Sequence, residues 1–232
     1  MELLKKEKYN FEDLKEIMRI LRSENGCPWD REQTHESIRN NFIEEVYEAI
    51  EAIDEKNHEL LREELGDVLL QIIFHSQISS ENGEFDADGV CGDICRKLII
   101  RHPHIFSDVI ADNSTNELSS FQVLSNWENI KIEEKGYNNT REYIESTAKS
   151  LPALMRAEKI QKRFIKRKVI EKPGTEDILK NLRENLSELN ERNVNEEDVG
   201  RLLYDVVSLA NEHNISAEQA LYDYNKKIIK KM

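Results

Sequence analysis

The chain has 232 residues, enough for one large domain or two small ones. Its 46 acidic side chains outnumber the 33 basic ones, and a net charge of −13 argues against non-specific binding of nucleic-acid polymers, which would be repelled. Only 8 Gly and 4 Pro occur, which argues against a turn-rich β-sandwich and favours long helices.

No segment approaches the run of about 18 apolar residues that a membrane span requires, and the first residues lack the apolar stretch of a signal peptide. The three cysteines, Cys27, Cys91 and Cys95, are few and odd in number, which is typical of a reducing compartment. We therefore expect a cytoplasmic protein without a membrane partner. Cys91 and Cys95 lie one helical turn apart, but no second cysteine pair completes a zinc site, and we interpret both as packed on a helix face.

The apolar pattern of the first hundred residues predicts four helices. The first covers 11–21 and is interrupted by the segment from Gly26 to Pro28, where a helix cannot continue. The other three are expected over 34–53, 58–79 and 86–101. A short turn joins the second and third helices, which must therefore pack antiparallel.

The rest of the chain is also expected to be helical, apart from a polar, turn-rich loop over 107–120. Helices are expected over 121–135 and over the basic segment 151–168, which we interpret as a solvated charged face. Lys172-Pro173-Gly174 is the clearest boundary in the chain, and a second helical unit is expected over 177–231.

Two of the predicted helices carry acidic groups with the same spacing, i, i+1 and i+4. In each helix two of the acidic residues lie along one edge of an apolar stripe. Because the two helices are antiparallel neighbours, these edges can face each other and bring four carboxylates together. The groups are Glu44, Glu45 and Glu48 in the helix over 34–53, and Glu63, Glu64 and Asp67 in the helix over 58–79.

Clustered carboxylates repel one another, and a hard divalent cation relieves that repulsion. Ligands that are all oxygen favour Mg²⁺ or Mn²⁺ over zinc. A di-iron centre usually has Glu-x-x-His, whereas the fourth positions here are Glu48 and Asp67. His75 is interpreted as a packed core histidine. The alternative to a metal site is a pair of solvated acidic helix faces.

Cationic side chains that could bind phosphate occur at the end of the helix expected over 86–101. Lys97 and Arg101 lie four residues apart on one face, where Lys supplies a point charge and Arg a fork of donors. Such a pair alone is usually a solvated surface. The two tryptophans, Trp29 and Trp127, could each stack on a nucleobase, although core packing is the ordinary role of tryptophan.

These segments, taken together and in this order, resemble the MazG family of nucleoside triphosphate pyrophosphohydrolases over about residues 11–165. The resemblance implies an all-α, dimeric module of the four-helix-bundle type. It also implies Mg²⁺-dependent cleavage between the α- and β-phosphates, giving a nucleoside monophosphate and pyrophosphate. The matching segments are Asn25-Gly26-Cys27-Pro28-Trp29-Asp30, Glu44-Glu45-x-x-Glu48, Glu64-Leu65-Gly66-Asp67, Lys97-x-x-x-Arg101-His102-Pro103-His104, Trp127-Glu128-x-Ile130-Lys131 and Ser150-Leu151-Pro152-Ala153-Leu154.

The resemblance further implies roles for individual residues and for small ligands. The substrate would be a nucleoside triphosphate, the cofactor Mg²⁺ with Mn²⁺ as the alternative, and the chain a homodimer. Glu45, Glu48, Glu64 and Asp67 match the metal ligands, Glu44 and Glu45 are the candidate catalytic carboxylates, Lys97 and Arg101 match the triphosphate-binding pair, and Trp127 matches a tryptophan of the nucleotide site.

The C-terminal third resembles a second module that has lost its acidic site. Asn185 replaces a carboxylate, and Arg201 places a cation at the position of a metal ligand, where it would repel a divalent ion. We therefore expect two tandem MazG-like helical modules: a catalytic one over 1–135, a linker and basic helix over 136–173, and a degenerate second module over 174–232.

Two further expectations follow from this degenerate module. Arg201 is expected to pair with Glu188 or Asp198, so that an internal ion pair replaces the metal ion. The alternative to an enzyme is a helical binding or regulatory protein that holds nucleotides or a partner without turning them over.

Overall fold

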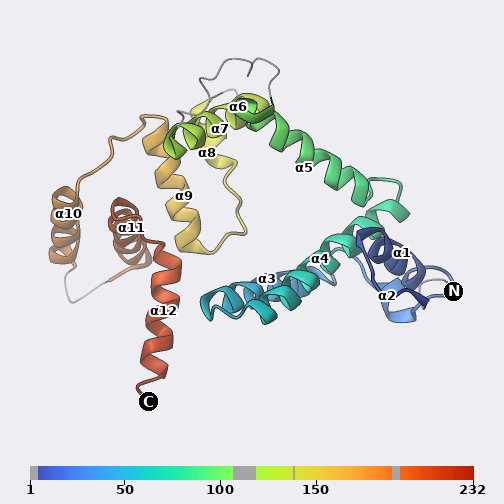
Figure 1. Ribbon diagram of the computed structural model, residues 1–232. Helices are drawn as coiled ribbons and strands as arrows, with labels where there is room; N and C mark the ends of the chain where they lie inside the picture. Colours follow the sequence, from blue (N-terminus) through green and yellow to red (C-terminus); the bar gives the residue numbers. More distant parts are fainter. Residues whose placement is uncertain (1–4, 107–118, 138, 190–193) are drawn as a thin grey trace. The chain divides into compact units, whose positions relative to one another are not determined.

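The computed structural model describes residues 5–106, 119–137, 139–189 and 194–232, and every regular element in these ranges is a helix (Figure 1). The expected all-α class is therefore confirmed for this part of the chain, and residues 107–118, where we expect a loop, lie outside it. None of the described helices combines the length and the apolar character needed to cross a bilayer.

The chain divides into two compact units, residues 1–123 and 124–232. The module boundaries expected near 135 and 173 from the sequence stay predictions. The first unit contains α1 (Phe11–Leu21), α2 (Pro28–Glu32), α3 (Arg39–Asp54), α4 (His58–Glu81), α5 (Ala87–Arg101) and α6 (Pro103–Phe106).

Side-chain caps explain where several of these helices begin. Asn10 and Asp13 form a reciprocal capping box at the start of α1. The side chains of Asn57 and Asp86 accept hydrogen bonds from the first turns of α4 and α5. Pro28 is the first residue of α2, a position where its missing N–H costs nothing, so the break predicted around Gly26 ends in a new short helix.

The helix expected from residue 34 begins five residues later, at Arg39. The intervening residues form a local turn in which the Thr34 amide donates to Ser37 Oγ at 2.9 Å, and the Ser37 amide donates to Thr34 Oγ1 at 3.3 Å. Hydroxyl side chains that bond to nearby amides compete with helix formation, which explains the later start.

The core of the first unit lies where α1 and the second half of α4 meet. Arg22, just after α1, is buried there and bonds to Glu81 at 2.7 Å, and its guanidinium lies over the ring of Phe74. The same guanidinium donates to the carbonyls of Asp30 and Gln33, which fastens the segment around α2 to this core. The buried apolar residues are Met18, Ile38, Ile73, Phe74, Ile78 and Ala87.

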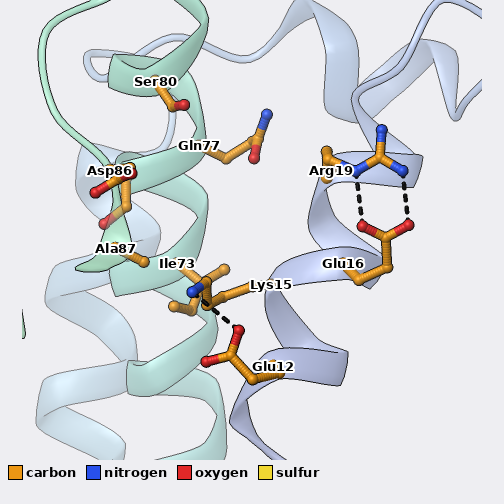
Figure 2. A pocket seen from close by; sticks show the side chains of 10 residues that line it. Glu12, Lys15, Glu16, Arg19, Ile73, Gln77, Ser80, Asp86 and Ala87 are labelled. Atoms are coloured by element: carbon orange, nitrogen blue, oxygen red, sulfur yellow. Dashed lines mark hydrogen bonds and ion pairs between the residues drawn. The ribbon is translucent and has the colours of Figure 1, made fainter. Parts of the chain in front are cut away.

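An open pocket of about 350 Å³ lies between α1, α4 and the beginning of α5 (Figure 2). The cations that line it are already paired: Lys15 with Asp88 of α5 at 2.5 Å and with Glu12 at 3.1 Å, and Arg19 with Glu16 at 2.6 Å. Because the lining residues supply no unpaired cation, we assign this pocket no role in binding phosphate.

The α3–α4 hairpin is the most extensive helix pair of the first unit, and it leaves an apolar face uncovered. Small buried residues, Ala49 and Ala52, let the two helices approach closely. The neighbouring side chains point away from the seam, and Val46 and Leu65 are 39% and 53% exposed. The exposed apolar residues of the hairpin are Ile43, Val46, Tyr47, Ile50, Ile53 and Leu65, and those of α5 are Val90, Ile94, Leu98, Ile99 and Ile100.

The second unit contains another packed helical hairpin, formed by α10 and α11, with α9 against α11. Gln161 of α9 is buried there: its amide donates to the carbonyl of Tyr204 at 2.8 Å, and its oxygen accepts from Asn211 at 2.8 Å. The helices are α7 (Ser120–Lys135), which crosses the division between the units, α8 (Thr140–Glu145), α9 (Ala153–Lys166), α10 (Thr175–Glu188), α11 (Glu196–Glu212) and α12 (Ala217–Ile229).

The basic helix α9 is only partly the solvated face that we expected. Its lysines are exposed, but Arg163 and Arg167 both lie over the ring of the buried Tyr143, at 4.5 and 5.0 Å from its centroid. Arg163 also donates to the Tyr143 carbonyl and to Ser146 Oγ. These two arginines therefore hold α8 against α9.

Candidate metal centre

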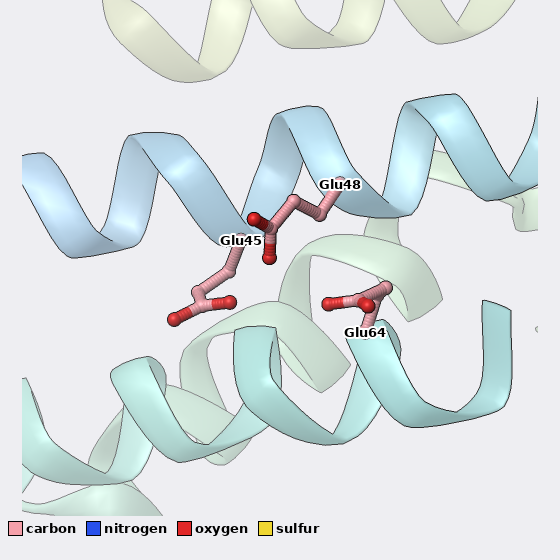
Figure 3. Close-up of side chains that lie close together, drawn as sticks. All are labelled: Glu45, Glu48 and Glu64. Carbon is pink, nitrogen blue, oxygen red and sulfur yellow. The ribbon is translucent and has the colours of Figure 1, made fainter. Parts of the chain in front are cut away.

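Three carboxylates meet in the seam between α3 and α4. Glu45 and Glu48 project from α3 and Glu64 from α4, and each places an oxygen within 4.8 Å of the others (Figure 3). In the described part of the chain, this is the one group of three or more His, Cys, Asp or Glu side chains that could hold a metal ion.

The sequence determines this meeting through helix periodicity and a short turn. Glu45 and Glu48 lie three residues apart and so share one face of α3. The turn of three residues before α4 then folds Glu64 back opposite them. Within that turn Lys56 has a φ of 56°, a left-handed conformation that reverses the chain tightly.

The other expected acidic residues surround this group without joining it. Asp67, expected as the fourth ligand, is not one of the three close carboxylates, but its charge raises the pKa of both Glu45 and Glu64. Glu44 and Glu63 are exposed neighbours whose charges raise the pKa of Glu45 and Glu64, respectively.

The electrostatics of the group favour a bound cation. Burial raises the pKa of Glu64, which is 9% exposed, and the charge of Glu48 raises it further. Burial likewise raises the pKa of Glu45, followed by the charges of Asp67 and Glu48. Among the described residues, no Lys or Arg forms an ion pair with these three carboxylates. An all-oxygen donor set that carries uncompensated negative charge suits a hard divalent cation.

The expected phosphate-binding pair lies on a different helix, toward the end of α5. Lys97 is exposed and Arg101 is half-buried. Figure 1 shows that α5 follows α4 and diverges from the α3–α4 hairpin that carries the carboxylate group. Trp127 is half-buried in α7 and belongs to the second unit.

A histidine pair further along α4 was not foreseen from the sequence. His75, interpreted as a packed core histidine, is half-buried and stacks on His35, with 5.0 Å between ring centroids and 2.7 Å between the two Nδ1 atoms. Phe42 also contacts His75. The two histidines are 40 residues apart, and no helical spacing links them. His35 is the missed residue, because it lies in the turn before α3.

The hairpin of α10 and α11, which we expect to be a degenerate second module, contains an ion pair and a side-chain hydrogen bond at the positions of interest. Arg201 pairs with Glu188 at 3.5 Å, which confirms the expected pairing with Glu188 or Asp198, and it also pairs with Glu197 at 4.0 Å. Asp198 instead completes a capping box at the start of α11. Asn185 donates to Asp205 at 2.5 Å.

These features define a class: an all-helical protein whose α-hairpin gathers carboxylates suited to a divalent cation. Comparison with known proteins identifies the family. Residues 33–106 match the model of the MazG nucleotide pyrophosphohydrolase domain. The chain is 40% identical over 225 residues, 95% of its length, to a nucleoside triphosphate pyrophosphohydrolase/pyrophosphatase MazG of Thermotoga maritima, and covers 83% of that protein.

Two further relatives agree with this match. A nucleoside triphosphate pyrophosphohydrolase of Escherichia coli is 40% identical over 219 residues, which are 91% of this chain and 81% of that protein. An uncharacterized protein of Bacillus subtilis, YabN, is 45% identical over 154 residues, 66% of this chain and 30% of that protein. The chain belongs to the MazG family of nucleotide pyrophosphohydrolases.

The histidine pair predicts a loss of stability in weak acid. Burial and the neighbouring His35 lower the pKa of His75 below its usual value of about 6.5. Below that pH the unfolded chain takes up a proton that the folded chain resists. Stability is therefore complete above about pH 6.5 and falls as the pH decreases toward the lower folded pKa.

We expect the free energy of unfolding, measured in urea between pH 7 and pH 5, to fall less in His75→Phe than in the wild type. The exposed His58 lies at the start of the same helix, so His58→Gln is the control and should keep the wild-type pH dependence. Equal pH dependence in all three proteins would contradict the assignment.

Proposed function

We propose that the chain is a Mg²⁺-dependent nucleoside triphosphate pyrophosphohydrolase, which cleaves between the α- and β-phosphates to give a nucleoside monophosphate and pyrophosphate. The observation that carries the proposal is the group of Glu45, Glu48 and Glu64, which lacks any protein cation among the described residues. The names of the Thermotoga and Escherichia relatives support the same activity.

In this proposal, the metal ligands are Glu45, Glu48, Glu64 and Asp67, with Mg²⁺ as the ion and Mn²⁺ as the alternative. Asp67 lies three residues after Glu64 on the same face of α4, and its charge raises the pKa of both Glu45 and Glu64, which supports its place beside the group. When bound, a divalent cation neutralises phosphate charge and makes a nearby water more acidic.

The remaining chemistry is assigned to side chains of this chain. Glu44, beside the ligands, orients the attacking water, and one of the two carboxylates, Glu44 or Glu45, accepts the proton that this water loses. The water oxygen forms a bond to the α-phosphorus, the bond from that phosphorus to the oxygen that bridges it to the β-phosphate breaks, and this oxygen leaves as part of pyrophosphate. Lys97 and Arg101 donate to the triphosphate oxygens as negative charge develops on them. Trp127 stacks on the base.

We also propose a homodimer. The support is the pair of uncovered apolar faces on the α3–α4 hairpin and on α5, which a monomer would expose to water. Two hairpins packed through these faces would form the four-helix arrangement that a single chain lacks.

The second module is proposed to be degenerate and structural. Its hairpin is held by the Arg201–Glu188 ion pair and by the hydrogen bond from Asn185 to Asp205. A fixed cation at this place would repel a divalent ion, so all turnover is assigned to the first module, residues 1–135.

Removing one proposed ligand tests the metal site. Asp67→Asn and Glu64→Gln should each lower pyrophosphate release at saturating Mg²⁺ by at least about 10²-fold, because a neutral amide is a poor ligand for a hard cation. Glu63→Gln removes the same charge from the exposed neighbour and should stay within a few-fold of the wild type.

Pyrophosphate release by Asp67→Asn at close to the wild-type rate would contradict the metal site. It would mean either that these carboxylates are not needed for catalysis or that the second module catalyses the reaction. Nucleotide binding without any pyrophosphate release by the wild type would support the alternative of a non-catalytic binding protein.

Arg101→Ala tests the phosphate-binding pair. Loss of one charge-stabilising donor should raise the activation free energy by about 2–4 kcal/mol, measured as a fall in kcat/KM. Arg96→Ala is the matched control, because Arg96 lies on the same helix, is exposed and pairs with Asp93. If Arg101→Ala keeps the kcat/KM of the Arg96→Ala protein, the pair is a solvated surface.

If the chain forms the proposed homodimer, a charge placed on the apolar face of the α3–α4 hairpin should lower the mass of the particle in solution. Ile50→Asp places a charge on that face and should shift the protein from dimer to monomer in analytical ultracentrifugation. Ile215→Asp alters an apolar residue of similar exposure between α11 and α12, and should leave the mass unchanged. A wild-type protein that sediments as a monomer at micromolar concentration would refute the dimer.

A further inference from the structure

Gln71 of α4 has an unusual combination of burial and missing partners. It is 6% exposed, and its Oε1 atom is buried without a hydrogen-bond partner. In the described residues of the first unit, it is the one buried side-chain oxygen or nitrogen left in this state. A buried carboxamide that forms no hydrogen bond destabilises the fold, so its presence at this place calls for another explanation.

The second unit contains a buried glutamine with a structural role, which can be compared with Gln71. Gln161 is 3% exposed, and both ends of its carboxamide are satisfied, by the Tyr204 carbonyl and by Asn211. Gln71 is buried to a similar degree but has no such partners. Its Oε1 atom therefore has no partner in the described chain that would compete with a ligand.

The position of Gln71 on α4 indicates which part of a ligand it would contact. It lies four residues after Asp67 and seven after Glu64, on the same face of α4. Side chains in a helix lean toward its N-terminus, so the carboxamide of Gln71 leans toward the carboxylate group. One turn further along α4 lies His75, stacked on His35. Gln71 thus lies between the carboxylates and a pair of flat aromatic rings.

A nucleotide whose phosphates are held at the carboxylates extends its sugar and base away from them. Seven residues of helix correspond to about 10 Å, a span comparable to the reach from phosphate to base. Base edges and sugar hydroxyls contain both donors and acceptors, and a carboxamide offers both in return. The rings of His35, His75 and Phe42 supply flat surfaces beside it.

We propose that Gln71 hydrogen-bonds the nucleoside part of the substrate and determines which nucleotide is bound productively. The inference rests on the proposed function, since it takes the carboxylate group as the place of the phosphates. It goes beyond that function because it assigns selectivity to a residue that contacts neither metal nor phosphate. A site that bonds a polar group of its substrate rejects an analogue that lacks the group, because its own polar atom is then left unpaired.

The experiment compares a nucleotide analogue with a ligand that has a chain of three phosphates but no nucleoside. Binding of an α,β-methylene nucleoside triphosphate, with the base that the wild type binds best, and of inorganic tripolyphosphate is measured by calorimetry with Mg²⁺. Gln71→Met, which keeps the length of the side chain and removes its polar atoms, should weaken nucleotide binding by at least about 10-fold. It should change tripolyphosphate binding by less than about twofold, because the phosphate contacts are intact.

The control variant is Gln77→Met, which makes the same chemical change on the same helix at a half-exposed residue that bonds to Glu81. It should leave the affinity for both ligands unchanged. The melting temperature of Gln71→Met should equal or exceed that of the wild type, because an unsatisfied buried amide has been removed. If this variant does not fold, Gln71→Asn, which withdraws the carboxamide by one methylene, decides the same comparison.

Equal weakening of nucleotide and tripolyphosphate would place Gln71 at the phosphates and overturn the inference. Unchanged affinity for both would make it a packing residue and also overturn it. A wild type that binds the analogue but releases no pyrophosphate from nucleoside triphosphates would refute the proposed function, and the binding comparison would still decide the role of Gln71. A wild type that binds tripolyphosphate but no nucleotide would overturn both.

Discussion

The mutual repulsion of carboxylates held in one helical seam is the constraint on which the first unit depends. Glu45, Glu48 and Glu64 are fixed close together by a short turn and by small buried residues beneath them. No cation of the described chain relieves them, so the fold stores unfavourable charge at the place where a ligand of opposite charge gains most. The packing elsewhere must offset this cost, and the buried Arg22 with its bonds to α2 and α4 contributes to doing so.

The α3–α4 hairpin and the α10–α11 hairpin differ in how the negative charge of their acidic side chains is balanced. In the first, the negative charge of Glu45, Glu48 and Glu64 is not balanced by a cation of the described chain, which suits the proposed divalent ion. In the second, a permanent guanidinium of the chain faces Glu188, and an amide replaces one acid. In the second hairpin, a side chain of the protein itself therefore balances the charge of Glu188, whereas in the first the three carboxylates have no such partner among the described residues.

Helix positions could be predicted from the sequence where apolar periodicity or a capping residue determines them. Contacts between side chains that are distant in the sequence could not be predicted. The helices α1, α4 and α5 lie within two residues of their expected bounds, because apolar spacing and the caps at Asn57 and Asp86 are local signals. The repeated acidic spacing led to the carboxylate group. The contact between His35 and His75, like the burial of Gln71, depends on helix rotation and register, which no local pattern encodes.

Because α3, α4 and α5 have uncovered apolar faces, the stability of a dimer that covers them would depend on the concentration of the chain. In the proposed homodimer, free energy that comes from covering such faces would grow with the concentration of partner copies, so folding and assembly would form one equilibrium. A newly synthesised chain at low concentration exposes these faces for longer, and during that interval it is a target for chaperones and for aggregation. Dilution would therefore act on the proposed dimer as a mild denaturant.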